Sequence, residues 1–164
     1  MRKSDGQAEE GTMAWRGVTA WIGAMVLTAG IALADPASPV NLGCFNGLAM
    51  NGYDVMSYWR GGTPQEGDPA ISAEHKGATW LFVSEENRAA FLADPDAYAP
   101  QYGGYCAYAA SRNALSDVDP FAWRIWKDKH YLNADPQVRR MWANRIDENI
   151  ALGDGYWPGL IATE

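Results

Sequence analysis

An uncharged apolar segment near the N-terminus constrains this chain most, because it decides how much of the chain takes part in the fold. Residues 17–34 have the sequence GVTAWIGAMVLTAGIALA, follow Arg16, and end on the small residues Ala32 and Ala34 around Leu33. A basic flank, an apolar run and small residues at a cleavage site are typical of a secretory signal. We therefore predict a signal peptide over residues 1–34 and a periplasmic or secreted protein.

An uncleaved membrane anchor is the alternative, since this run has the minimum length for crossing a bilayer. Its threonines, its glycines and the well-formed cleavage site favour removal, so we expect no stable membrane span after cleavage. The acidic Glu9 and Glu10 are unusual where a signal has basic residues. Met13 is a more typical start, and residues 1–12 are interpreted as a start-site extension.

The composition excludes several function classes. A net charge of −7 and a pI near 4.8 argue against binding to nucleic acid, because few cations are available to neutralise phosphates. Two cysteines and two histidines are too few for a disulfide scaffold, a four-thiolate zinc site or a three-histidine one. The aromatic content predicts a folded domain with a core of its own.

Two short β-hairpins are predicted from apolar residues around polar turns. The first spans residues 70–84 with its turn at His75-Lys76-Gly77, and the second spans residues 122–133 with its turn at Lys127-Asp128-Lys129. Residues 35–51 are rich in turn formers and are expected to form an extended N-terminal arm. The domain itself is then expected over residues 52–164.

Helices are predicted after each hairpin. Ser84 caps a helix that ends before Pro95, and Asp135 caps the longest helix, which begins at Pro136 and ends at Gly153. No internal repeat is evident. The expected fold class is α+β: a small single domain with two short β-hairpins packed against helices and its longest helix near the C-terminus.

Cys106 is the first candidate for chemistry, because it follows two glycines and lies among tyrosines. Three interpretations stay open: a disulfide with Cys44, the other cysteine, in an oxidising compartment; a buried and inert residue; or a metal ligand or reactive thiol. His75, in the first hairpin turn, is the second candidate metal ligand. The candidate ligand-binding residues are the tyrosines of this bend and one before it: Tyr53, Tyr102, Tyr105 and Tyr108.

Catalytic signals are sparse. The sequence contains no Gly-x-Ser-x-Gly elbow, no phosphate-binding loop and no dinucleotide fingerprint. The acidic residues are better explained as helix caps and solvated charges. The sequence therefore favours a protein that is not an enzyme.

Several phrases of the sequence, in their order, resemble the YHS domain family, and more closely the exported bacterial YHS-domain proteins. The resemblance covers about residues 40–160 and rests on GYDVMSY (52–58), GATWLFVSEEN (77–87), FLADPDAYAP (91–100), YGGYCA (102–107) and YLN (131–133). It implies a small α+β domain with a hairpin followed by a helix. It also implies a role in binding a metal, since relatives occur beside proteins that handle copper and heavy metals.

The chain departs from the metal-associated relatives where they have cysteine or histidine. The corresponding positions are Ser57, Val83 and Asn87. A metal would therefore have to be bound differently, through Cys106 with His75 or with tyrosine oxygens.

These observations predict a small periplasmic binding protein of YHS type, with a pocket around residues 102–108 that faces the first hairpin. The expected cofactor is a transition-metal ion such as copper, held by the Tyr-Gly-Gly-Tyr-Cys bend, and the possible partners are a small ligand or such an ion. Two alternatives from other classes remain: a thiol redox protein using Cys44 and Cys106, and a structural or protein-interaction module without a ligand.

Overall fold

The computed structural model describes residues 38–43 and 47–162. These residues form two antiparallel hairpins and several helices, which confirms the predicted α+β class. None of the described helices is long and apolar enough to cross a membrane. The predicted signal peptide and Cys44 lie outside the described residues.

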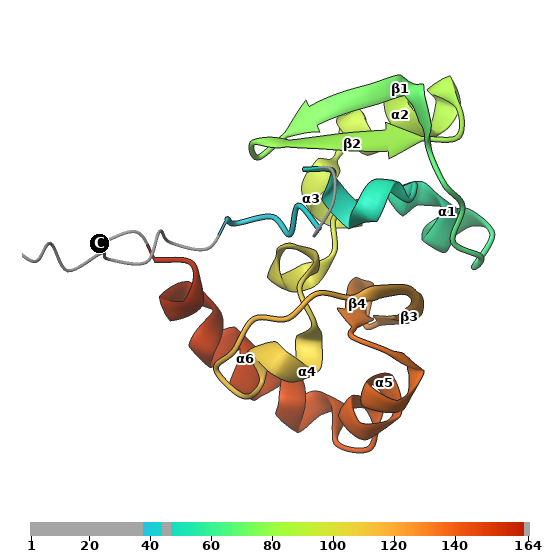
Figure 1. The fold of residues 1–164 in the computed structure, drawn as a ribbon. Coiled ribbons are helices and arrows are strands. Elements are labelled where there is room, and N and C mark those ends of the chain that lie inside the picture. Colours follow the sequence, from blue (N-terminus) through green and yellow to red (C-terminus); the bar gives the residue numbers. More distant parts are fainter. Residues whose placement is uncertain (1–37, 44–46, 163–164) are drawn as a thin grey trace, which may run out of the picture. The chain divides into compact units, whose positions relative to one another are not determined.

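The first half of the fold, residues 49–93, begins with a tight turn and ends with a helix. In order, its elements are η1 (Ala49–Gly52), α1 (Val55–Arg60), β1 (Asp68–His75), β2 (Ala78–Phe82) and α2 (Glu85–Ala93). The hairpin of β1 and β2 lies against α2 (Figure 1). A short helix, α3 (Pro95–Tyr98), connects this half to the next.

The second half, residues 101–143, has the same order of elements. They are η2 (Gln101–Gly104), α4 (Ala107–Ala110), β3 (Asp119–Trp126), β4 (Lys129–Asn133) and α5 (Pro136–Ala143). Helix α5 packs on the β3–β4 hairpin as α2 packs on the first hairpin. A further helix, α6 (Ile146–Leu160), contacts α4 and α5.

The two halves agree in detail as well as in order. In η1 the left-handed residues are Met50 and Asn51, and in η2 they are Tyr102 and Gly103. In the first hairpin the register shifts after Asp68, whose carboxylate accepts the amide of the second residue along. Asp119 occupies the same place in the second hairpin and accepts its amide in the same way.

The core of each half contains the same kind of ring pair. In the first, Trp80 of β2 lies 5.0 Å from Phe91 of α2, measured between ring centroids. In the second, Tyr131 of β4 lies 5.1 Å from Trp142 of α5, at the same spacing along the chain. The structure thus contains an internal repeat, and the expectation of none was wrong. We call residues 49–93 the first repeat and residues 101–143 the second repeat.

The long C-terminal helix is divided in two, which corrects its predicted course. Helix α5 ends at Asn144, and the next residue, Arg145, has a non-helical φ of −137°. At the break the carbonyl of Trp142 accepts the Arg145 amide at 3.3 Å and the side-chain amide of Asn149 at 2.8 Å. The longest helix is α6, and it does lie near the C-terminus.

Gly153 lies inside α6 rather than at its end. A Cβ atom on this residue would come within 2.7 Å of the Tyr102 hydroxyl, so the glycine makes room for a ring that packs on the helix. That hydroxyl donates to the carbonyl of Ile150 or to the carboxylate of Asp154, at 3.2 and 3.0 Å. The glycine therefore serves packing, where the sequence suggested a helix stop.

Candidate functional site

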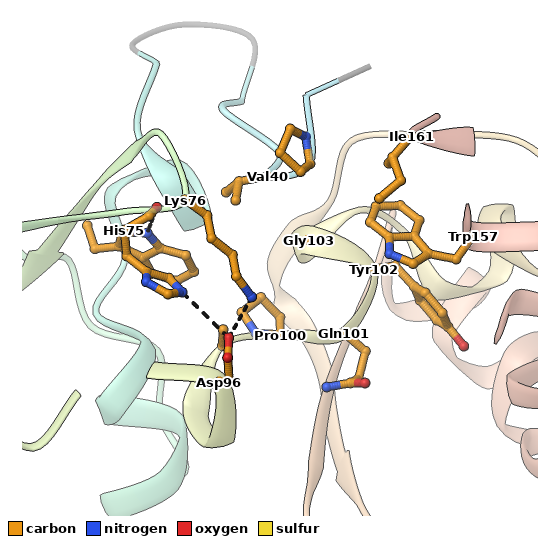
Figure 2. A pocket seen from close by; sticks show the side chains of 13 residues that line it. Val40, His75, Lys76, Asp96, Pro100, Gln101, Tyr102, Gly103, Trp157 and Ile161 are labelled. Carbon is orange, nitrogen blue, oxygen red and sulfur yellow. Dashed lines mark hydrogen bonds and ion pairs between the residues drawn. The ribbon is translucent and has the colours of Figure 1, made fainter. Parts of the chain in front are cut away.

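A cavity of about 330 Å³ lies between the turn of the first hairpin and the η2 bend. The hairpin contributes His75, Lys76 and Trp80, and the bend contributes the chain from Pro100 to Gly103 (Figure 2). The remaining lining residues are Pro39, Val40, Asp96, Ala99, Trp157 and Ile161. The cavity faces the first hairpin, but of residues 102–108, around which a pocket was predicted, only Tyr102 and Gly103 line it.

Local backbone geometry holds the walls of the cavity together. Gly103 has a φ of +56°, and a Cβ atom there would come within 2.0 Å of the Pro39 carbonyl oxygen. The carbonyl of Gly103 accepts the amide of Asn41 at 2.8 Å. Only glycine allows this close approach, and the approach brings residues 39–40 against the bend.

The polar side of the cavity is built around one carboxylate. Asp96 accepts from the Lys76 ammonium at 2.5 Å, and the Nε2 atom of His75 lies 3.7 Å from the same oxygen (Figure 2). The bond with Lys76, more than the nearby His75, lowers the pKa of Asp96 below its usual value. The carboxylate is therefore ionised and neutralised by the lysine.

His75 has an unused hydrogen-bonding group. Its Nε2 atom is buried and has no hydrogen-bond partner within the part of the chain that the structure describes. The ring is fixed edge-on against Phe91 at 5.7 Å and is tilted against Trp80 at 6.3 Å. A buried nitrogen without a partner is costly, so it marks a place where a ligand or a water would gain a bond.

The apolar side of the cavity is aromatic. Trp80 is 2% exposed, and its indole N–H donates to the His75 carbonyl, so its ring is fixed. Trp157, from α6, packs against Tyr102 at 5.8 Å and Tyr105 at 6.1 Å. Two fixed indoles with one polar corner suit a small flat molecule that carries a single polar group.

Cys106 does not line this cavity. It is 1% exposed, forms the N-cap of α4, and accepts the Ala109 amide at 3.5 Å through its sulfur. The sulfur lies 3.9 Å from Oδ1 of Asn133. Among the described residues the thiol is free. Since Cys44 lies outside those residues, the disulfide stays a prediction.

The four candidate tyrosines are distributed over different surroundings. Tyr102 lines the cavity, and Tyr105 lies behind it against Trp157. Tyr108 stacks below the Arg112 guanidinium at 4.6 Å, and Tyr53 packs edge-on against Phe121 at 5.8 Å. Burial raises the pKa of Tyr102, so its hydroxyl stays protonated and donates to its partners on α6. The structure thus brings His75 and Tyr102 to one cavity and places the other candidates elsewhere.

Ser57, Val83 and Asn87, where the sequence departs from the pattern of metal-associated YHS domains, lie around Asp54. Oδ2 of Asp54 accepts the Val83 amide at 2.9 Å and the Asn87 side-chain amide at 2.6 Å, and its carbonyl accepts the Ser57 hydroxyl. Asp54 is fully buried. The place is occupied by a hydrogen-bonded carboxylate that organises α1, β2 and α2. No group of three or more His, Cys, Asp or Glu side chains with metal-site geometry occurs among the described residues.

Sequence analysis did not identify Lys76, Asp96 or Trp157 as site residues. Lys76 was predicted only as part of the first hairpin turn. Its pairing with Asp96 joins a hairpin turn to α3, and such a contact has no signature along the chain. The internal repeat offers the missing signal, because Lys127 and Asp147 form the same pair after the second hairpin, at 2.9 Å.

Comparisons with known proteins add no assignment: no family description, curated protein or solved structure matches this chain.

Proposed function

We propose that this chain is a small exported binding protein of YHS type that holds a small flat organic acid in the cavity between the first hairpin and the η2 bend. The observation that carries the proposal is the buried Nε2 atom of His75, which has no partner among the described residues and lies at the polar corner of an aromatic cavity. A binding role needs no catalytic group, in keeping with the sparse catalytic signals of the sequence.

The size and lining of the cavity define the ligand class. At about 330 Å³ the cavity has the size of a site for a small ligand. Its apolar walls include the indoles of Trp80 and Trp157, which favour a ring. At the polar corner, Lys76 uses one of its three N–H groups on Asp96 and keeps the others for a second acceptor. A carboxylate there would accept from Lys76 and from the His75 imidazole.

The test uses three probes with the same ring and different polar groups: 1-naphthoate, 1-naphthalenemethanol and 1-naphthylmethylamine. Binding is followed by two-dimensional NMR of the tryptophan indole N–H groups, which reports on Trp157 and Trp80 at the cavity. We expect 1-naphthoate to bind about tenfold more tightly than the alcohol, because one charge-assisted hydrogen bond adds roughly that much. The amine should bind most weakly.

The repeat supplies a matched control. Lys76→Ala should weaken 1-naphthoate binding about tenfold. Lys127→Ala removes the equivalent lysine, which forms the same type of pair with Asp147, and should leave the affinity unchanged. Equal losses in the two variants, or perturbation of indole signals other than those of Trp80 and Trp157, would contradict the proposal.

A transition-metal ion such as copper is a second candidate occupant, favoured by the nearness of His75 Nε2 to Asp96 Oδ1, 3.7 Å apart. Imidazole nitrogen and carboxylate oxygen are both ligands for such ions. Calorimetric titration with Cu²⁺ distinguishes this candidate: His75→Gln should abolish the binding, whereas Cys106→Ser should preserve it. Copper binding that depends on Cys106 would indicate instead that the metal site lies in the Tyr-Gly-Gly-Tyr-Cys bend.

A further inference from the structure

A second concave surface lies on the other hairpin, and it is basic although the chain is acidic. It is an open groove of about 510 Å³ lined by Trp123, Arg124, Ile125, Arg139, Arg140 and Ala143. Strand β3 supplies one wall and helix α5 the other. Three guanidinium groups thus line one groove of a chain whose net charge is −7. We call it the arginine groove.

The arginines of the groove have no carboxylate partner in residues 38–43 and 47–162. Three of the four arginines elsewhere in that part of the chain do: Arg60 pairs with Glu86, Arg88 with Glu85, and Arg145 with Glu148. In the groove, Arg139 donates to the Trp123 carbonyl at 3.2 Å, and Arg124 lies over the Trp126 ring at 5.7 Å. Neither contact neutralises charge, so the groove carries three uncompensated positive charges.

The fold itself does not need arginines at two of these three places, as the first repeat shows. Arg124 opposes Tyr131 in β3–β4 just as Ala73 opposes Trp80 in β1–β2. Counted from the helix caps Ser84 and Asp135, the equivalents of the other two, Arg139 and Arg140, are Arg88 and Ala89.

The one arginine that both repeats share has lost its partner in the second. Arg88 pairs with Glu85 at 2.7 Å. The residue at the place of Glu85 in α5 is Pro136, and the carboxylate of Asp135, four residues before Arg139, caps the helix. Arg139 instead donates to the Trp123 carbonyl, which leaves its charge available to an external anion.

The strand that supplies one wall of the groove is anchored on its other face. The Trp123 indole packs edge-on against Tyr58 at 5.4 Å and against His130 at 6.2 Å, with interplanar angles above 80°. Both of those side chains are buried. An anchored strand needs little ordering when a partner arrives at the groove.

We propose that the arginine groove binds an acidic peptide segment of a partner protein, with carboxylates on the three guanidiniums. Guanidinium binds carboxylate with two parallel hydrogen bonds, which gives both affinity and orientation. A long polyanion such as nucleic acid, or an extended anionic membrane, would be repelled by the rest of a chain with charge −7. A short acidic segment avoids that repulsion.

The test is fluorescence anisotropy with a short labelled peptide in which glutamate alternates with leucine, titrated with the purified protein. We expect a dissociation constant in the micromolar range at about 50 mM salt and weakening of about tenfold at about 200 mM, because screening removes most of the attraction. A counterpart peptide with glutamine in place of glutamate should not bind measurably. Failure of the acidic peptide to bind at the lower salt concentration would overturn the proposal.

Matched charge reversals locate the site. The double variant Arg124→Glu with Arg140→Glu changes two exposed residues of the groove and should abolish binding. The control, Arg60→Glu with Arg145→Glu, changes the net charge equally outside the groove and should weaken binding less than threefold. Equal losses in both would overturn the proposal. So would retention of an anionic phosphatidylglycerol vesicle or of heparin, rather than the peptide, through the groove arginines.

Discussion

In the first repeat the helix that follows the tight turn begins at a buried carboxylate, Asp54, whereas in the second repeat it begins at a buried thiol, Cys106. The backbone around the two residues is the same. The amide of Asp54 donates to the Gln65 carbonyl at 2.8 Å, and the amide of Cys106 donates to the Ser116 carbonyl at 3.0 Å. One backbone position therefore carries two different side-chain chemistries.

The difference lies in how many donors each side chain satisfies. Asp54 accepts from Met56, Val83 and Asn87, while the sulfur of Cys106 accepts one long bond from Ala109. In the second repeat the amide of Tyr108, which corresponds to that of Met56, is instead bound by Asn133 at 3.3 Å. In the second repeat the side chain of Asn133 accepts the amide that in the first repeat binds the Asp54 carboxylate. A small, weakly polar residue is therefore sufficient at the cap. Capping and packing are therefore sufficient to explain why a buried cysteine stands at this position of the bend.

Of the differences between the repeats, the loss of the two cap side chains should give the largest difference in free energy of unfolding. We expect Asp54→Ala to lower the free energy of unfolding by about 4 kcal/mol, because three buried N–H donors lose their acceptor. Cys106→Ala should cost only about 1 kcal/mol, since it removes two weak bonds, with Ala109 and Asn133, and leaves a small space. Urea unfolding followed by tryptophan fluorescence measures both.

Asp54→Asn serves as the control, because the amide keeps one acceptor oxygen and should recover part of the loss. If Cys106→Ala proved as damaging as Asp54→Ala, the thiol would have a stabilising partner beyond Ala109 and Asn133. A disulfide with Cys44 would be that partner, and unfolding under reducing conditions would then show the same loss in the unchanged chain.

The tight turns offer the second contrast, since each places a different residue at the same left-handed position. Asn51 has a φ of 54° in η1, and Gly103 has a φ of 56° in η2. Exchanging the residues tests packing alone, because asparagine tolerates this conformation. Gly103→Asn should cost about 3 kcal/mol, because its Cβ would meet the Pro39 carbonyl oxygen at 2.0 Å.

The reverse exchange, Asn51→Gly, should cost less than about 1 kcal/mol, because it removes only a long bond to the Val118 carbonyl at 3.4 Å. Thermal unfolding of both variants provides the measurement. A larger loss for Asn51→Gly than for Gly103→Asn would show that the contact of residues 39–40 with the bend contributes little to stability.

The sequence predicts local structure well, because local signals produce it. Both hairpins and the caps Ser84 and Asp135 lie where the alternation of apolar residues and the cap residues indicated. The break between α5 and α6 was missed, because apolar residues keep the helical period across it. The break is marked instead by a side-chain bond across it, in which Asn149 donates to the carbonyl of Trp142.

The repeat escaped sequence analysis because the two halves share a backbone and few side chains. At equivalent places stand Trp80 and Tyr131, and Phe91 and Trp142, which are alike only in being large and aromatic. A pocket facing the first hairpin was predicted around residues 102–108, of which Tyr102 and Gly103 line the cavity. The polar corner of the cavity was not predicted. The bond between Lys76 and Asp96 depends on the packing of α3 next to the hairpin turn, and no local sequence pattern predicts that packing.

His130 marks a third contrast between the repeats, because its counterpart is a threonine. Thr79 is partly exposed and donates to Glu74, whereas His130 is fully buried against the Tyr58 ring at 4.5 Å. Neither of its ring nitrogens has a partner within the described part of the chain. Burial lowers the pKa of His130 to about 3, because an imidazolium there would be desolvated without compensation.

A lowered histidine pKa makes stability depend on pH in one direction. Above pH 6.5, the ordinary histidine value, His130 is neutral in both the folded and the unfolded chain and contributes no pH dependence. Below pH 6.5 the unfolded chain binds a proton that the folded chain does not. The free energy of unfolding therefore decreases as the pH is lowered, down to about pH 3. We expect a loss of about 2 kcal/mol between pH 7.5 and pH 5, measured by urea unfolding.

His130→Leu removes the titrating group and keeps an apolar side chain of similar size in the aromatic surroundings. It should therefore flatten the pH dependence between pH 7.5 and pH 5 while leaving stability at pH 7.5 close to that of the unchanged chain. His75→Gln is the control, because the chain has two histidines and this variant retains the buried one. If His75→Gln flattened the profile and His130→Leu did not, the proton linkage would belong to the cavity of the first repeat, and the burial of His130 would have no thermodynamic consequence in this range.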